Sequence, residues 1–153
     1  MIIRPVVMYD SEMWALTVAD ENRLNCWERK VLRTIYGPIA DNGVRRNIKL
    51  KELYNDADLV TAIKVGRLRW LGHLERMDRG RGPRKAFEGH PRGKRPRGRP
   101  RLRWLQDVED DLQKMQIHQW RRKAVDREGW SNLLKEAKVL QGPQCQRKKK
   151  TRR

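Results

Sequence analysis

The sequence predicts a mainly α-helical protein built from several amphipathic helices. Apolar side chains recur at three- and four-residue steps in several stretches, a spacing that lines up one face of a helix. Gly-Pro pairs at 37–38 and 142–143 are typical helix ends. The chain is 37% apolar and 37% charged, whereas average globular proteins are about 45–50% apolar and about 25% charged. We therefore expect small helical units rather than one large core.

Residues 1–18 are expected to form a short extended segment. Ile2, Ile3 and Val6 favour a strand, and Pro5 would confine that strand to the edge of a sheet. A single short strand is not stable without a partner, and the sequence offers none nearby. We interpret residues 1–18 as the remnant of an upstream domain.

Residues 19–78 form the first predicted helical unit. A helix is expected from Asp20, a candidate N-cap, to Tyr36, just before the Gly-Pro stop. A turn is predicted at residues 41–43, and residues 55–58 offer caps for a second long helix. The apolar face of the first helix comprises Leu24, Trp27, Val31 and Ile35.

The second long helix of this unit carries both an apolar stripe and a set of cations. The stripe comprises Leu59, Ile63, Gly66, Trp70, Leu74 and Met77. Basic side chains lie mostly away from it, so we expect the helix to pack with one side and to contact nucleic-acid phosphates with another. These candidate phosphate ligands are Lys64, Arg67, Arg69 and Arg76.

Residues 79–100 are predicted to be a basic linker or binding loop. Residues 78–100 hold five glycines and four prolines, which disfavour helix and inner strand. The end of this stretch should be an extended, solvated cationic ribbon, which suits the phosphate backbone of a nucleic acid. The candidate binding residues of this ribbon are Lys94, Arg95, Arg97, Gly98, Arg99, Pro100 and Arg101.

Residues 101–142 form the second predicted helical unit. In its first helix the stripe Leu102, Leu105, Val108, Leu112 and Met115 should face inward. A second helix is expected over residues 119–140, with a break near the glycine at position 129. The acidic residues of the first helix should face solvent, where they could pair with the basic ribbon: Asp107, Glu109, Asp110 and Asp111.

Residues 143–153 are expected to be a disordered basic tail. Six of the last seven residues are basic and none is acidic, so like charges repel and nothing apolar can fold the segment. The tail is typical of a nuclear-import signal or a non-specific nucleic-acid arm. Its candidate binding residues are Arg147, Lys148, Lys149 and Lys150.

The net charge of +18 is concentrated in two blocks. Residues 64–101 carry a net charge of +11 and residues 147–153 a net charge of +6, while the remaining segments are close to neutral. Such an arrangement favours a polyanionic partner, RNA or DNA.

Several classes of protein do not fit the sequence. No phosphate-binding loop, Gly-x-Ser-x-Gly or His-Glu-x-x-His motif is present, so we expect no enzyme activity and no cofactor. The two cysteines, Cys26 and Cys145, and three scattered histidines do not form a zinc pattern. No apolar run is long enough for a membrane span or a signal peptide, so a nuclear or cytoplasmic location is expected rather than secretion.

Two alternative functions stay open at this point. Residues Arg97-Gly98-Arg99-Pro100 match the core of an AT-hook, so the chain could be a chromatin adaptor that binds the minor groove of A·T-rich DNA. It could also be a protein–protein interaction module that docks its partner on the acidic helix or on a tryptophan face.

Several segments together resemble non-LTR (LINE-type) retrotransposon polyproteins, over about residues 4–140. The similarity lies in the region that follows the polymerase domain of that family. It is carried by Tyr9 to Trp14, Trp27 to Arg33 with Ile35-Tyr36-Gly37, Arg67 to Met77, Gly93 to Pro100, and Trp104, Asp107, Asp111-Leu112, Asp126-Arg127 and Trp130.

The resemblance implies a parent endonuclease–reverse transcriptase, an RNA-directed DNA polymerase, of which this chain is the C-terminal thumb and post-polymerase region. The polymerase and endonuclease residues of that family have no counterpart here. The expected function is therefore a non-catalytic nucleic-acid-binding fragment that contacts template RNA or target DNA phosphates.

Overall fold

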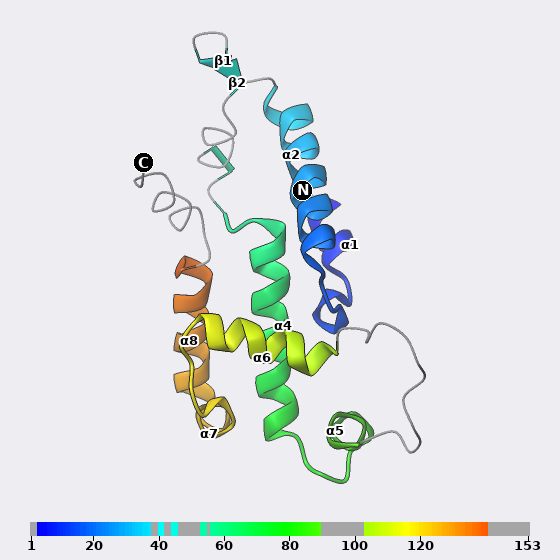
Figure 1. The fold of residues 1–153 in the computed structure, drawn as a ribbon, viewed down its shortest axis with the longest axis vertical. Coiled ribbons are helices and arrows are strands. Elements are labelled where there is room, and N and C mark those ends of the chain that lie inside the picture. Colours follow the sequence, from blue (N-terminus) through cyan, green and yellow to red (C-terminus); the bar gives the residue numbers. More distant parts are fainter. Residues whose placement is uncertain are drawn as a thin grey trace.

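The computed structural model describes residues 3–37, 40–41, 44–45, 53–54, 56–89 and 103–140. These residues are mainly helical (Figure 1), which confirms the predicted fold class. The N-terminal half contains α1 (Ile3–Met8), the 3₁₀ turn η1 (Ser11–Met13), α2 (Val18–Tyr36) and α4 (Leu59–Arg76). Then follow α5 (Gly82–Glu88), α6 (Trp104–Lys114), α7 (Trp120–Val125) and α8 (Arg127–Leu140).

The prediction of an extended N-terminal segment is wrong, because α1 and η1 occupy most of its described part. A helix satisfies its own backbone hydrogen bonds, whereas an edge strand needs a partner strand. Pro5 lies in the first turn of α1, where its missing N–H is not needed. Val7 and Met8 pack on a small core around Leu59, so α1 contributes these two apolar side chains to the core from a helix.

Two caps and a buried carboxylate fix the start of α2 and α4. Thr17, not Asp20, is the N-cap of α2, and Asp20 completes a capping box three residues later. The hydrogen bond from the Thr17 side chain holds the pKa of Asp20 below its ordinary value. Asp58 caps α4 by accepting from the Thr61 N–H. The buried Glu28 of α2 accepts from the Leu59 N–H at 2.9 Å, which joins the two helices.

A short antiparallel pair follows α2. Strands β1 (Ala40–Asp41) and β2 (Val44–Arg45) pair in the register Asp41 to Val44. Asp41 of the turn predicted at 41–43 lies in β1, and residues 42 and 43 lie outside the described residues. Gly37 ends α2 with a φ of 77°, a left-handed conformation that glycine adopts without strain.

Helix α4 lies at the centre of the fold, with α2 on one side, α8 on the other and α6 across it (Figure 1). Its first half packs with Leu16 and with Leu24 and Trp27 of α2. Its second half contributes Leu68 and Leu71 to the larger core, which is completed from α6, α7 and α8 by Val108, Leu112, Ala124, Trp130, Leu134 and Ala137. Because neighbours cover most of α4, its buried surface is wider than the predicted stripe.

The predicted linker over 79–100 contains a helix, α5, which corrects the start of that segment. Arg84 is 5% exposed and holds α5 against the end of α4. Its Nη1 donates to the Leu74 carbonyl and to Glu75, both at 2.7 Å, and its Nε donates to Glu88 at 2.7 Å. The hydrogen bond to Glu75 is the main reason why the pKa of Arg84 is raised. The basic composition of this segment predicted a linker, but Arg84 within it forms ion pairs with Glu75 and Glu88 of the same chain.

Two boundaries in the second helical unit also differ from the prediction. Helix α6 begins at Trp104, and the break in the last helical segment lies at Asp126 rather than near Gly129. Asp126 accepts from the Glu128 N–H at 3.1 Å, so it starts α8. An oxygen of the Asp126 carboxylate lies where a Cβ of residue 129 would overlap it, so glycine at this position leaves room for the carboxylate.

The indole of Trp130 fixes the contact between α8 and α4. It is 2% exposed, and its Nε1 donates to the Leu68 carbonyl at 3.0 Å. A Cβ at Gly72 would overlap this ring, so only glycine allows the two helices to lie this close.

We expect Gly72→Ala to lower the free energy of unfolding by about 1–3 kcal/mol, because the added methyl group overpacks the Trp130 site. Gly66→Ala is the matched control on the same helix, since a Cβ there meets nothing within 4 Å. It should be neutral or stabilise by up to about 1 kcal/mol, as expected for glycine replaced inside a helix. Urea unfolding measures both, and equal effects of the two variants would contradict the close contact.

Candidate nucleic-acid interface

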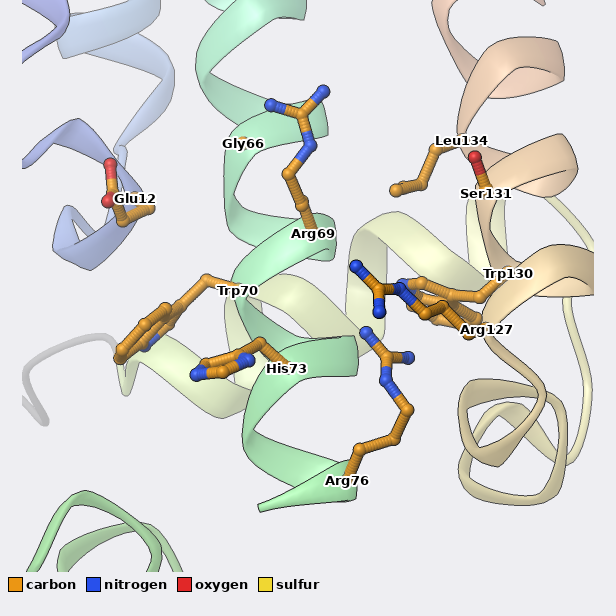
Figure 2. A pocket seen from close by; sticks show the side chains of 10 residues that line it. All are labelled: Glu12, Gly66, Arg69, Trp70, His73, Arg76, Arg127, Trp130, Ser131 and Leu134. Atoms are coloured by element: carbon orange, nitrogen blue, oxygen red, sulfur yellow. The ribbon is translucent and has the colours of Figure 1, made fainter.

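A surface cavity of about 460 Å³ lies along one face of α4 and reaches η1 and α8 (Figure 2). We call it the α4–α8 groove. Its α4 residues, apart from the adjacent pair Arg69 and Trp70, follow one another at steps of three positions, which places them along one side of the helix. The lining residues are Glu12 of η1, Gly66, Arg69, Trp70, His73 and Arg76 of α4, and Arg127, Trp130, Ser131 and Leu134 of α8.

The groove is rich in guanidinium groups. Arg69, Arg76 and Arg127 are exposed and come from two helices, whereas Glu12 is the one carboxylate among the lining residues of the cavity. Arg76 Nη1 donates to the Ala124 carbonyl at 2.6 Å, which holds its side chain along the end of α4. Guanidinium groups bind phosphate oxygens through paired N–H donors, so the groove suits an anionic ligand.

Aromatic rings form another part of the wall. The ring centroids of Trp70 and His73 are 5.3 Å apart with an angle of 36° between the planes. Trp130 is buried and its indole N–H is engaged by the Leu68 carbonyl, so it offers an apolar floor. The position of η1, which carries Glu12, is fixed by a hydrogen bond from the Trp104 indole to the Glu12 carbonyl at 2.7 Å.

The four predicted phosphate ligands of α4 fall on two different faces. Arg69 and Arg76 line the groove. Arg67 is only 1% exposed, with its Nη2 2.6 Å from Asp107 and its Nη1 3.9 Å from Asp111. A phosphate cannot reach Arg67 in this fold, so the expectation that it binds nucleic acid does not hold for the folded chain.

Lys64 is also engaged inside the protein. Its Nζ lies 2.7 Å from Glu21 and 3.3 Å from Asp111. Burial alone would lower the pKa of Lys64, but the hydrogen bond to Glu21 and the charge of Asp111 outweigh it and raise the pKa. Lys64 therefore stays protonated while being neutralised by internal carboxylates.

Two of the four acidic residues of α6 do not face solvent as predicted. Asp107 and Asp111, four residues apart and hence on one face, turn toward α4, whereas Glu109 and Asp110 are exposed. Asp107 Oδ2 also accepts from the Leu16 N–H at 3.0 Å. The distances to Arg67 are those of ion pairs, yet its three guanidinium nitrogens form no aligned hydrogen bond within the described part of the chain. The attraction is therefore mainly Coulombic.

The remaining predicted ligands lie outside the described residues. These are Lys94, Arg95, Arg97, Gly98, Arg99, Pro100 and Arg101 of the ribbon, and Arg147, Lys148, Lys149 and Lys150 of the tail.

The sequence does not predict the whole groove. His73, Arg127 and Ser131 are not among the candidate binding residues named from the sequence. The spacing of Arg127, Ser131 and Leu134 indicates a common helix face. It does not show that this face lies beside α4, which depends on the Trp130 contact.

The described ranges contain no group of three His, Cys, Asp or Glu side chains that could hold a metal ion. None of the helices described is both long and apolar enough to cross a membrane. Comparison with known proteins found no matching family model, no similar curated protein and no similar solved structure.

Arg67→Met should lower the free energy of unfolding by about 3–5 kcal/mol, because it leaves the Asp107 and Asp111 carboxylates poorly compensated in a buried position. Arg69→Met, two residues further along and exposed, should change it by less than about 0.5 kcal/mol. Denaturant unfolding of the two variants provides the comparison. A mild effect of Arg67→Met would show that its side chain is not held inside the fold.

Proposed function

We propose that the chain is a non-catalytic nucleic-acid-binding protein that holds phosphates in the α4–α8 groove. The observation that carries this proposal is the meeting of three exposed arginines from two helices in one cavity with aromatic walls. Phosphate contacts supply most of the affinity of proteins for nucleic acids, and arginine is well suited to make them.

The distribution of ion pairs supports the groove as the binding face. Carboxylates of α2 and α6 neutralise Lys64 and Arg67. No described carboxylate lies within ion-pair distance of Arg69 or Arg127. The positive charge left over on α4 is therefore on the groove side, where an external anion would replace the missing internal partner.

Charge elsewhere in the sequence supports the same partner. The ribbon from Lys94 to Arg101 connects α5 to α6, and the last seven residues add a net charge of +6. A long polyanion can contact several such segments at once, which a small anion cannot. The resemblance to non-LTR retrotransposon polyproteins would make that polyanion the template RNA or target DNA of a reverse transcriptase.

The orientation of α6 favours this function over the protein–protein alternative. Two of the four carboxylates that were candidates for docking a partner, Asp107 and Asp111, are used within the chain. The AT-hook alternative concerns residues 97–100, which lie outside the described part, and it stays a prediction.

The double variant Arg69→Gln/Arg127→Gln should weaken nucleic-acid binding and reduce its dependence on salt. For duplex DNA, the slope of log K against log salt should become shallower by about 0.9 for each phosphate contact removed. Fluorescence anisotropy of a labelled oligonucleotide, titrated over a series of salt concentrations, measures both quantities.

Arg122→Gln/Lys123→Gln is the matched control, because both residues are exposed on α7 and neither lines the groove. It also removes two charges and should change the slope much less. Equal losses in the two variants would show that only net charge matters. Binding that does not respond to salt in the unmodified chain would refute the proposal itself.

A further inference from the structure

We propose that the α4–α8 groove binds an unpaired nucleotide of a single-stranded nucleic acid, with the base against Trp70 and His73 and its phosphate at Arg76 and Arg127. This inference rests on the function proposed above and specifies the strand state of the ligand. It is carried by the position of two aromatic rings beside two guanidinium groups in one cavity.

The two rings form an accessible aromatic surface. Trp70 is half-buried and lines the cavity, so packing on α4 restrains its indole while part of the ring stays open. His73 is exposed one turn further along, with its ring centroid 5.3 Å from that of Trp70. Trp70 was expected in the packed stripe, but the neighbours of α4 cover the adjacent faces and leave this one open. A base can stack on such a surface whatever its sequence.

The cations that would hold the phosphate line the same cavity as the two rings. In Figure 2, Arg76 and Arg127 extend toward the same part of the cavity, from the end of α4 and the start of α8. The hydrogen bond from Arg76 to the Ala124 carbonyl restrains one of these groups before any ligand arrives. A restrained side chain loses less conformational entropy on binding.

The size and shape of the cavity favour an unpaired nucleotide over a duplex. Its volume of about 460 Å³ is within the range of about 300–1,000 Å³ that holds small ligands. Trp130 and Leu134 add buried apolar surface to its lining on the α8 side. In a double helix the flat faces of the bases are covered by their neighbours, so a duplex could use the arginines but not the rings. A single strand can use both.

Three ligands distinguish this inference from simple charge attraction: a labelled oligothymidine strand, the same strand annealed to oligoadenine, and free thymidine monophosphate as competitor. We expect Trp70→Ala to weaken binding of the single strand about 5- to 150-fold, the range seen for loss of one stacked base. Duplex binding should change less than about twofold, because it depends on phosphate contacts alone. Trp70→Phe, which keeps a ring, should retain most of the single-strand affinity.

Two further variants distinguish the loss of a stacking ring from a general effect on folding. His73→Ala removes an exposed ring and should also weaken only the single strand. Trp14→Ala is the matched control, since Trp14 is 38% exposed and lies outside the groove. It should leave both affinities unchanged.

The outcomes separate the two proposals. Equal losses of affinity for single strand and duplex in Trp70→Ala, or no loss for either, would overturn the unpaired-nucleotide site. The proposal of salt-dependent phosphate binding through Arg69 and Arg127 is not affected by that result. Thymidine monophosphate that competes as strongly as the oligonucleotide would indicate a site for free nucleotides and would also overturn it. Absence of salt-dependent binding to any of the three ligands would overturn both proposals.

Discussion

The buried charge cluster between α4 and α6 determines how the central helix is oriented. Arg67 is almost completely enclosed, and the carboxylates of Asp107 and Asp111 compensate its charge at 2.6 Å and 3.9 Å. Removing a guanidinium from water is costly, so the fold is stable only when α6 brings its acidic face to this place. Because successive residues of a helix are about 100° apart, fixing Arg67 inward turns Arg69 and His73, about 200° and about 240° further round the helix, toward the open side.

The contact between Trp130 and Gly72 adds the second wall of the groove. The indole packs where a side chain at position 72 would lie and donates its N–H to the Leu68 carbonyl. This places the start of α8, with Arg127, beside the exposed face of α4. The groove therefore depends on two contacts in the core behind it. One is the electrostatic contact of Arg67 with Asp107 and Asp111, and the other is the steric contact of Trp130 with Gly72.

The chain uses its positive charge in two ways. Lys64, Arg67 and Arg84 are structural cations, each close to carboxylates of the same chain, and they contribute to stability. Arg69, Arg76 and Arg127 are exposed at the groove and are available to an external anion. Net charge alone does not distinguish the two groups, because members of both lie in the basic segment 64–101, and Arg67 and Arg69 are only two residues apart.

The sequence by itself determined the mainly helical class, the position of the two long helices in the first unit and a helix cap within residues 55–58, because these depend on spacing and on residues within a few positions. It also identified Arg69 and Arg76 as candidate ligands. Only the tertiary structure decided that Arg67 is buried, that Asp107 and Asp111 face inward, that residues 3–8 are helical and that Arg127 joins the groove. The physical reason is that a helical repeat shows which residues share a face, whereas the neighbour that covers the face is supplied by residues far away in the chain.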